Sequence, residues 1–376
     1  MVRPGKNEST IGETVLEIDL SALENNYRYL VAKIAPGTRF MAVVKAFAYG
    51  SEAGSIAMKL QQLGADYFAV AYTSEGVALR DAGITRPILV LHPQPISYQT
   101  IIARCLEPAL YSEHLLQGFA ETAKNEGQKD YPVHLKFNTG LNRLGLNPET
   151  AGQIASEIKD IPALRVASVF SHLAASEDPA EKEFTEDQLR AFAKICISVE
   201  KELGYRPLRH LLNTSGILNY PEHQYDMVRS GIGLYGFGND AIHDAELIPI
   251  ASLKTVISQV HEIQAGESVG YNRAFRADNR VRTATLPLGH ADGIGRQYGK
   301  GKGYVTIHGQ RASILGNVCM DMIMVDVTGI DCREGDEVVV FGKDASADAL
   351  ATAAGTISYE LITGISQRVR RSIIGG

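Results

Sequence analysis

The sequence predicts an α/β fold, a (β/α)8 TIM barrel followed by a mainly antiparallel β domain. Short β-branched runs alternate with amphipathic stretches over the first two thirds of the chain, which is typical of βα units. Eight such runs within about 240 residues match the strand number and size of a TIM barrel. Beyond Gly238, hydrophobic and polar residues alternate within short runs. These runs lie close together with turn signals between them, which indicates an antiparallel sheet. We therefore expect a barrel over residues 12–240 and a β domain over 241–376, against which residues 1–18 are expected to pack.

The expected elements follow one another along the chain. A helix-like segment, LSALENNYRYLVAKI, begins at residue 20. The eight barrel strands are expected in FMAVVKA (from 40), DYFAVAY (66), PILVLH (87), EPALYS (107), PVHLKFN (132), RVASVFSHL (165), RHLLNTS (209) and MVRSGIGLYG (227). The β domain is expected to use runs such as SLKTVISQVHEI, VRTATLPL, GYVTIHGQRASILG and MIMVDVT. It is expected to close with a helical segment, ADALATAAGTISYELITGI, and a basic tail, SQRVRRSII.

The composition narrows the classes of function. The 376 residues are 45% hydrophobic and 21% charged, which permits a large core and excludes a disordered chain. A net charge of -6 offers no general attraction for nucleic acid or an anionic membrane, so neither is an expected partner. The four cysteines lie far apart, without CxxC spacing or a histidine cluster, so no metal site is expected.

The expected location is cytoplasmic. Scattered cysteines fit reduced thiols in a cytosol. The N-terminal stretch MVRPGKNEST is polar, no apolar signal-peptide core follows it, and no segment has the apolar length that spans a bilayer.

A lysine ends the first expected barrel strand. Lys45 follows the apolar run of residues 41–44 and so lies at the C-terminal face of the barrel, where TIM-barrel active sites are built. Such a lysine either extends its ammonium group into solvent or serves as a nucleophilic amine in a pocket. Its position alone leaves both readings open.

Two other strand ends indicate an anion site. The seventh run ends in Asn213 and Thr214, and the eighth contains a glycine-rich turn at Gly231. Barrels frequently bind phosphate at these loops, through backbone N–H groups and a hydroxyl, although these residues taken alone favour two ordinary turns. A phosphorylated aldehyde would use both this site and a strand-end lysine, and pyridoxal phosphate is such a cofactor.

The same segments resemble the alanine racemase family. AVVKAFAYG is similar to the family's lysine segment, AVVKANAYGHG. Further similar segments follow in the family's order, namely LKFNTGLNRLG, FSHLAASED, LNTSG, MVRSGIGLYG, ESVGYNRAF, GHADGIGR, GNVCMDM and TISYELITGI before RVRR. The resemblance spans residues 14 to 371, and it implies a barrel followed by a β domain.

The resemblance implies that Lys45 binds pyridoxal phosphate covalently. Further cofactor-binding roles follow for residues that offer a hydroxyl, an amide or a backbone N–H, namely Tyr49, Asn213, Thr214, Gly231, Ile232 and Tyr359. Arg229 resembles the arginine that faces the pyridine nitrogen, and because a guanidinium keeps its charge, that nitrogen is expected to stay unprotonated. His172 resembles the histidine that supports this arginine, although on its own it reads equally well as an ordinary satisfied histidine.

Racemisation needs proton-transferring groups on both faces of a planar intermediate. The resemblance assigns one face to Lys45 and the other to Tyr271, which the family contributes from the partner subunit, so a homodimer is expected. Arg143 matches the arginine that orients the cofactor and lies near the substrate carboxylate, and Met320 matches a partner segment that binds that carboxylate. Lys136 matches a lysine that the family often carbamylates.

Several positions depart from the family pattern. Phe47 stands where asparagine or aspartate is usual, Asn138 replaces an aspartate, and Thr214 replaces a serine. His290 replaces the tyrosine of the substrate-entry corridor, whereas Arg296 still matches the corridor arginine. A titratable imidazole in that corridor leaves substrate entry and its pH dependence open.

The resemblance therefore implies an alanine racemase that interconverts L- and D-alanine and supplies D-alanine for peptidoglycan. One alternative is a racemase of another or broader range of amino acids, for example serine. A second is a pyridoxal-phosphate-dependent decarboxylase with a similar barrel and β domain, which needs no base on the second face. A non-enzymatic carrier of pyridoxal phosphate fits less well, because carriers of the single-barrel type have no β domain.

Overall fold

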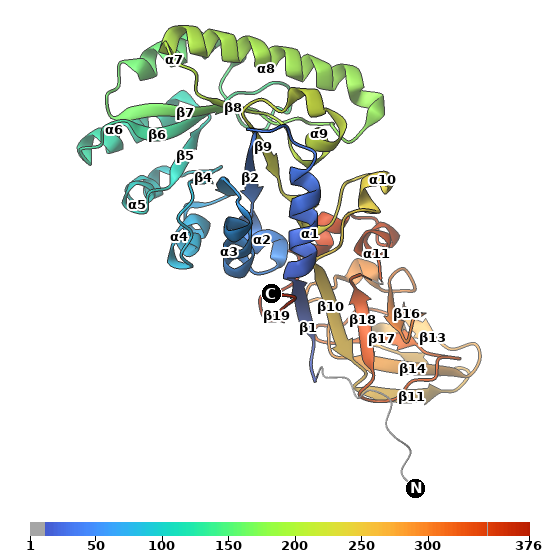
Figure 1. The fold of residues 1–376 in the computed structure, drawn as a ribbon. Coiled ribbons are helices and arrows are strands. Elements are labelled where there is room, and N and C mark those ends of the chain that lie inside the picture. Colours follow the sequence, from blue (N-terminus) through green and yellow to red (C-terminus); the bar gives the residue numbers. More distant parts are fainter. Residues whose placement is uncertain (1–11, 344) are drawn as a thin grey trace. The chain divides into compact units, whose positions relative to one another are not determined.

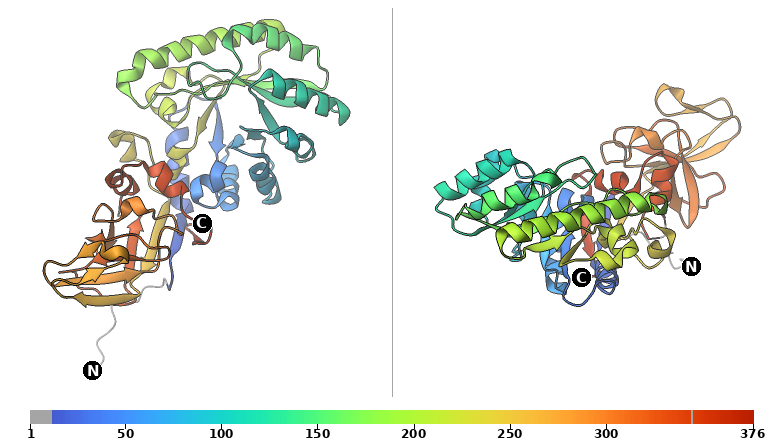
Figure 2. Two further views of the ribbon diagram at one scale, coloured as in Figure 1. Left: turned by 180° about the vertical axis from the view of Figure 1, so that it is seen from behind. Right: turned by 90° about the horizontal axis from the view of Figure 1, so that it is seen from above.

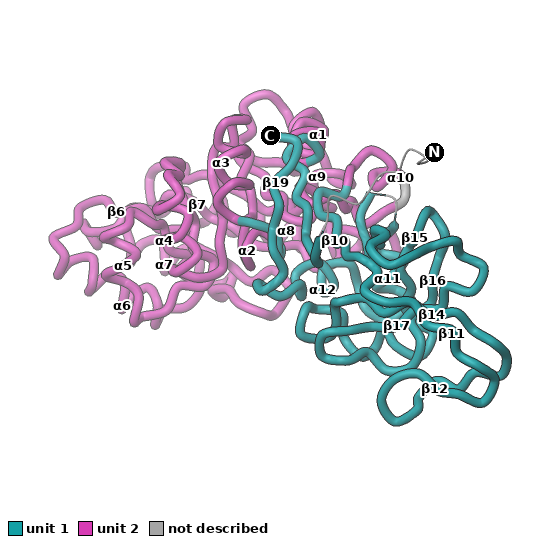
Figure 3. The backbone as a smooth tube through the Cα atoms, turned by 90° about the horizontal axis from the view of Figure 1, so that it is seen from below, with its two compact units in different colours: residues 1–22, 49–52, 249–376 teal, residues 23–48, 53–248 magenta. Residues whose placement is uncertain are grey.

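The computed structural model describes residues 12–343 and 345–376 (Figure 1). The chain forms two compact units, which Figure 3 colours separately. Residues 23–48 and 53–248 form the barrel unit. The chain up to Ala22, residues 49–52 and residues 249–376 form the β unit.

The barrel unit contains a closed barrel of eight parallel strands (Figure 1). The strands are β2 (Arg39–Val43), β3 (Tyr67–Val70), β4 (Ile88–Val90), β5 (Glu107–Leu110), β6 (Tyr131–Lys136), β7 (Leu164–Phe170), β8 (Leu208–His210) and β9 (Met227–Ser230). Each overlaps one of the eight predicted segments, and β9 pairs with β2 to close the barrel. The predicted TIM barrel is confirmed.

One helix precedes the first barrel strand, and further helices follow the strands (Figure 1). They are α1 (Leu20–Val31), α2 (Lys45–Gly50), α3 (Ala53–Leu63), α4 (Thr73–Asp81), α5 (Tyr98–Ala103), α6 (Glu113–Asn125), α7 (Ala151–Lys159), α8 (Lys182–Leu203), α9 (Thr214–Asn219) and α10 (Ala241–Asp244). The long α8 packs along α7 (Figure 2). In α6, Leu115, Leu116 and Phe119 are buried on one face, as the 3.6-residue period predicts. No helix in the described part of the chain is long and apolar enough to cross a bilayer.

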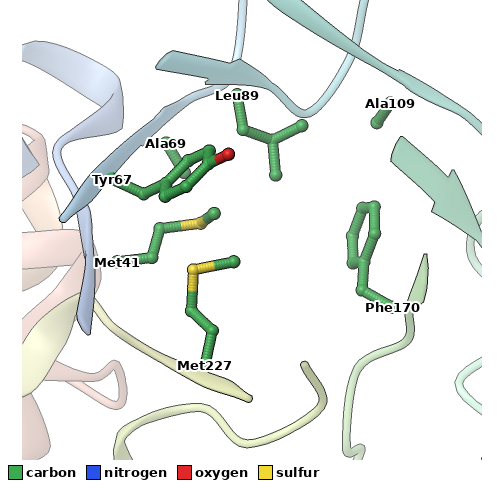
Figure 4. Close-up of a cluster of buried hydrophobic side chains, with 7 residues drawn as sticks. All are labelled: Met41, Tyr67, Ala69, Leu89, Ala109, Phe170 and Met227. Atoms are coloured by element: carbon green, nitrogen blue, oxygen red, sulfur yellow. The ribbon is translucent and has the colours of Figure 1, made fainter. Parts of the chain in front are cut away.

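The interior of the barrel follows the two-residue period of its strands. Figure 4 shows inward side chains from six of the strands meeting in one apolar cluster. Its members are Met41, Tyr67, Ala69, Leu89, Ala109, Phe170 and Met227. Burying a side chain such as Met41 or Phe170 contributes about 1.5–3 kcal/mol. Arg229 lies two residues beyond Met227 and therefore on the same inward face, towards the C-terminal end of the barrel.

The β unit is built on a nine-stranded sheet in the order β11-β14-β17-β16-β15-β18-β10-β1-β19, which is antiparallel except between β1 and β19. The strands are β1 (Val15–Asp19), β10 (Ala251–Val256), β11 (Gln259–Ile263), β14 (Val281–Leu286), β15 (Tyr304–Ile307), β16 (Gln310–Leu315), β17 (Ile323–Asp326), β18 (Glu337–Phe341) and β19 (Arg370–Ile374). A short hairpin, β12 (Ser268–Val269) and β13 (Phe275–Arg276), lies outside this sheet. The predicted, mainly antiparallel sheet is confirmed.

The termini of this unit differ in detail from the sequence-based picture. The helical segment expected over residues 347–365 is two helices, α11 (Ala347–Ala353) and α12 (Ser358–Thr363), because Gly355 turns the backbone to a φ of 77° between them. The basic tail contains β19, which pairs in parallel with β1. Residues 1–11 of the N-terminal segment lie outside the described residues, and the predicted domain boundary between 240 and 241 stays a prediction.

Candidate active site

The segment that begins with Lys45 is a turn of left-handed helix. It starts two residues after β2 ends at Val43, so Lys45 lies at the C-terminal end of the first barrel strand, as the sequence predicted. Four successive residues have φ angles between 53° and 55°, namely Ala46, Phe47, Ala48 and Tyr49. A left-handed helical conformation costs an L-residue about 1–2 kcal/mol, and strain of this kind concentrates at functional sites.

A carboxylate from the next βα unit fixes the start of this turn. Glu75 Oε1 accepts the backbone N–H of Ala46 at 2.5 Å. The other oxygen of Glu75 accepts the N–H groups of Ala71 and Tyr72 at 2.7 and 3.0 Å, at the start of α4. Glu75 therefore ties the Lys45 segment to the end of β3, and its negative charge lies near the lysine.

Four cations gather in the mouth of the barrel, namely Lys45, Lys136, Arg143 and Arg229. Burial is the main cause that lowers the pKa of Lys45, the charge of Arg143 adds to it, and Glu75 opposes it. Burial and the three neighbouring cations lower the pKa of Lys136 to about 8. Both amines therefore lose a proton more readily than a surface lysine does.

Arg229 is almost completely buried, and its hydrogen bonds fix the plane of its guanidinium. Its Nη2 donates to the carbonyl oxygens of Ser171 (2.7 Å) and Leu211 (2.9 Å) and lies 3.3 Å from Nδ1 of His172. Its Nη1 donates to Nδ1 of His210 at 2.7 Å. Burial lowers the pKa of Arg229 to about 9, which still leaves the group charged at neutral pH.

His210 is a residue that sequence reasoning missed. Its bond to Arg229 is shorter than that of His172, which was predicted to support this arginine. The ring of Phe170 stacks on His210 at 4.8 Å and lies 5.5 Å from the Arg229 guanidinium and 6.0 Å from the Lys136 amine. The available signal was a histidine inside an apolar strand segment, but nothing in the sequence showed that it faces inward.

The loop that carries Arg143 is organised by Asn138. The Asn138 Oδ1 accepts the N–H groups of Gly140 and Asn142 at 3.2 and 3.0 Å, and its Nδ2 donates to Asn142 Oδ1 at 2.8 Å. An aspartate could accept the first two bonds but could not donate the third. The departure at position 138 therefore has a local structural reason.

The predicted phosphate turn is assembled within the barrel unit. Asn213 caps α9, while the hydroxyls of Thr214 and Ser230 lie 3.0 Å apart. The N–H of Gly233 donates to the Thr214 hydroxyl at 3.3 Å, and a Cβ on Gly233 would lie only 2.6 Å from the Thr214 methyl group. This close approach brings the turn of residues 231–232 against Thr214.

Tyr49 and Tyr359 lie together in the β unit. Their ring centroids are 6.3 Å apart. The adjacent Gly50 has a φ of +81°, and a Cβ there would lie 2.2 Å from the carbonyl oxygen of Ile362, in the same helix as Tyr359. Arg371 donates to the carbonyl oxygen of Gly50 at 2.8 Å. The glycine of the AYG sequence is thus required by close packing as well as by its backbone conformation.

Tyr271 and Met320 are exposed on neighbouring loops of the β unit. The Tyr271 side chain is 74% exposed and that of Met320 is 59% exposed. Asn317 donates to the carbonyl oxygen of Tyr271 at 3.2 Å, which joins the two loops. The backbone N–H groups of residues 290–291 donate to the carbonyl oxygens of residues 319–320 at 3.0 Å. His290 therefore lies beside Met320.

An arginine holds these loops in place. Arg368 bonds to Asp292 at 2.7 Å and to Asp321 at 2.6 Å, so one side chain connects both segments. His290 and Arg296, predicted for the entry corridor, are both exposed. The roles of all the predicted site residues stay predictions, but the residues of each unit are grouped as a site would require.

Comparison with known proteins decides the family. A family model for the N-terminal domain of alanine racemase matches residues 18–238, and one for the C-terminal domain matches residues 250–373. The chain belongs to the alanine racemase family. Membership in this family makes it a racemase, an isomerase, and confirms the resemblance found in its segments.

Individual alanine racemases are similar to this chain over nearly its whole length. The alanine racemase of Desulfovibrio desulfuricans is 35% identical over 360 residues, which cover 94% of this chain and 96% of the relative. That of a Synechocystis species is 37% identical over 368 residues, covering 96% and 98%. Among solved structures, the alanine racemase of Streptomyces lavendulae superposes with a TM-score of 0.92 at 31% identity, with 98% of each chain covered. The alanine racemase of Bartonella henselae, solved with covalently bound pyridoxal phosphate, gives a TM-score of 0.88 at 28% identity, covering 97% of this chain and all of that one.

Proposed function

We propose that the protein is a pyridoxal-phosphate-dependent alanine racemase that interconverts L- and D-alanine by a two-base mechanism. It acts in the cytoplasm as a homodimer and supplies D-alanine for peptidoglycan. The observation that supports this most is Lys45, a half-buried amine of lowered pKa at the C-terminal end of the first barrel strand, in the same cationic cluster as Arg229. Family membership and the bound cofactor of the Bartonella henselae relative point the same way.

The residues of the barrel unit fit pyridoxal phosphate. Lys45 offers an amine for covalent attachment, and Thr214 with the turn of residues 231–232 offers a hydroxyl and backbone N–H groups for the phosphate. Arg229 gives three hydrogens to Ser171, Leu211 and His210. Its Nε hydrogen and second Nη1 hydrogen make no hydrogen bond to the described residues, so donors remain for the ring nitrogen. Asn213, Tyr49 and Tyr359 complete the proposed cofactor contacts.

The cofactor, when bound, supplies an electron sink that acidifies the α-hydrogen of the amino acid. Arg229 limits that sink, because a guanidinium donates a hydrogen bond without readily giving up its proton to the ring nitrogen. Lys45 Nζ accepts or returns a proton on one face, which its lowered pKa favours. The phenol of Tyr271 from the other subunit does so on the opposite face. Arg143 and Met320 orient the substrate carboxylate, and the exposure of Tyr271 and Met320 leaves both side chains free to enter a partner's site.

Lys136 is expected to become carbamylated in bicarbonate. Carbamylation needs a neutral amine, and with a pKa of about 8 half of this amine is neutral at that pH. The product is an anion among Lys45, Arg143 and Arg229, so it replaces repulsion by attraction. With 13C-labelled bicarbonate at about pH 8, a protein-bound carbamate carbon signal is expected in 13C NMR spectra, and it should be absent from Lys136→Met.

The same variant tests what the carbamate does. Removing a charged partner of Arg143 is expected to lower kcat/KM by roughly ten- to a hundredfold, because a hydrogen bond to a charged group contributes about 1.5–3 kcal/mol. A short carboxylate such as acetate should restore part of that activity in Lys136→Ala. A wild-type protein without the carbamate signal in excess bicarbonate would contradict this assignment of Lys136.

One assay separates the proposed function from its alternatives. The cofactor-loaded protein is incubated with single enantiomers of alanine, serine and larger amino acids, and optical activity and carbon dioxide release are followed. Loss of optical activity with alanine as the best substrate supports the proposal. Preference for another amino acid would identify a different racemase, and carbon dioxide release would identify a decarboxylase. His290 makes the comparison with serine and larger substrates informative, since it stands in the proposed entry corridor with Arg296.

A further inference from the structure

A chain of hydrogen bonds extends from Arg229 through five successive barrel strands, β9 to β5. The distances are 2.7 Å from Arg229 Nη1 to His210 Nδ1, 2.8 Å from His210 Nε2 to Ser168 Oγ, 2.6 Å from Ser168 Oγ to His134 Nδ1, and 2.7 Å from His134 Nε2 to Glu107 Oε2. The three middle side chains are fully buried, and Glu107 is 9% exposed. None of the last three residues belongs to the proposed catalytic or cofactor-binding set.

The direction of every bond in this chain follows from its ends. A guanidinium has donors only, so His210 Nδ1 must accept and its Nε2–H must donate to Ser168. The Ser168 oxygen is then an acceptor for His210, and its hydroxyl hydrogen is left to donate to Nδ1 of His134. His134 Nε2–H consequently donates to the carboxylate of Glu107. A cation at one end and an anion at the other thus set one tautomer for both histidines, and each bond satisfies a buried polar group.

Packing holds both imidazole rings in the orientation that the chain requires. The register between β6 and β7 shifts just before His134, where Ala167 is an extra residue in β7, and His134 pairs directly with Ser168 across the strands. The ring of Phe170 stacks on His210 with an interplanar angle of 4°. The ring of Tyr67 meets His134 edge-on at 6.1 Å and 88°. Neither imidazole can turn to exchange its two nitrogens without displacing a neighbouring aromatic ring.

We propose that Glu107, His134 and Ser168 are positioning residues for Arg229. The carboxylate of Glu107 fixes the tautomer of His134, which directs the Ser168 hydroxyl hydrogen to His134, and the Ser168 oxygen accepts the Nε2–H of His210 and so holds that ring with its unprotonated Nδ1 facing the guanidinium. Arg229 is then held in one position, charged, with its remaining donors directed away from His210. One part of the inference rests on the proposed function, namely that Arg229 in this position faces the cofactor ring.

The first test interrupts the chain at its centre. In protein labelled with 15N-histidine, two-bond 1H–15N correlation spectra distinguish the two imidazole tautomers, and His210→Gln and His134→Gln assign the signals. In the wild-type protein both histidines are expected to be Nε2–H tautomers. In Ser168→Ala the Nε2–H of His210 loses its acceptor, so the His210 signal is expected to shift, although Arg229 keeps Nδ1 unprotonated. In Ser168→Thr, which keeps the hydroxyl, it should return to the wild-type form.

Kinetics of the cofactor-loaded protein supply a second readout. Ser168→Ala is expected to lower kcat about tenfold with little change in KM, because the guanidinium is misplaced without loss of substrate contacts. The visible spectrum of the bound cofactor should shift in the same variant, and both effects should be reversed in Ser168→Thr. A Ser168→Ala protein with the wild-type His210 signal, visible spectrum and kcat would overturn the proposal.

Two variants of Glu107, at the other end of the hydrogen-bond chain, distinguish the effect of its charge from that of its hydrogen bond to His134. Glu107→Gln keeps an oxygen that can accept from His134 and should retain the His134 tautomer, whereas Glu107→Leu should show a mixture of His134 tautomers. Should Glu107→Leu fail to fold, Glu107→Gln with both Ser168 variants still decides the outcome, since a mixed tautomer in Glu107→Gln would contradict an acceptor role. The tautomer measurements do not depend on turnover. A protein that racemises no amino acid would therefore refute the proposed function and leave this inference to be judged separately.

Discussion

Lys45→Ala is expected to reduce racemisation by at least about 10⁴-fold and to abolish covalent attachment of pyridoxal phosphate. The expected loss is large because one side chain is assigned two tasks, attachment of the cofactor and proton transfer at one face. Proton transfer alone contributes about 10²–10⁴-fold. The variant should still fold, since Lys45 is half-buried and makes no side-chain ion pair in the described part of the chain.

The measurement must distinguish Lys45 from Lys136, because both are enclosed amines of lowered pKa in the same cluster. Borohydride treatment of the cofactor-loaded protein, followed by peptide mass spectrometry, is expected to place the cofactor on the peptide that contains Lys45. Cofactor found on Lys136 instead would contradict the assignment. Lys201→Ala, at a side chain that is 81% exposed, is the control and should match the wild type.

A further pair of variants separates charge from proton transfer at this position. Lys45→Arg keeps the positive charge but has a guanidinium that does not release its proton at working pH, so it should be as inactive as Lys45→Ala. Added methylamine should restore part of the activity of Lys45→Ala, because a small free amine can enter the space left by the side chain. Activity in Lys45→Arg near the wild-type level would show that the amine is not the reacting group.

The barrel could be predicted because its signals are local. Each strand is a short apolar run, and the end of a parallel strand always faces the same end of the barrel, so the sequence alone places Lys45 at the mouth. The proposed phosphate turn was predicted for the same reason, since Thr214 and Gly231 follow neighbouring strands, and its role stays a prediction. The antiparallel sheet could also be predicted, from its runs of alternating hydrophobic and polar residues.

The parts that could not be predicted depend on register and on long-range contacts. The strand β19 reads as a charged tail because its partner, β1, lies at the other end of the sequence. His210 and Glu107 belong to one polar chain because His134 pairs with Ser168, and this register, with its shift at Ala167 of β7, cannot be predicted from the sequence. The left-handed turn after Lys45 is held by the hydrogen bond from Ala46 to Glu75 and is followed by the close packing at Gly50. Neither contact can be predicted from the sequence of the turn itself.

Tyr271→Phe is expected to lower racemisation by about 10²–10⁴-fold in both directions while leaving stability unchanged. The phenol is assigned the proton transfer on the second face, and loss of such a group has an effect of this size. The side chain is 74% exposed, so removal of one hydroxyl should change the free energy of unfolding by less than about 0.5 kcal/mol. In deuterated water, one alanine enantiomer should still exchange its α-hydrogen through Lys45, with retention of configuration. Undiminished racemisation of both enantiomers would exclude the two-base mechanism.

Mixing two inactive variants shows in which subunit Tyr271 acts. In a hybrid dimer of Lys45→Ala and Tyr271→Phe, one site receives Lys45 from one subunit and Tyr271 from the other, provided that the tyrosine serves its partner. Random reassociation of equal amounts makes about half of the dimers hybrid, each with one intact site of two, so roughly a quarter of the wild-type activity should return. If the tyrosine served its own subunit, no hybrid would contain an intact site and no activity would return. Recovery on mixing therefore tests the dimer, the exposed loop and the second base together, and its absence from two folded variants would assign Tyr271 to its own chain.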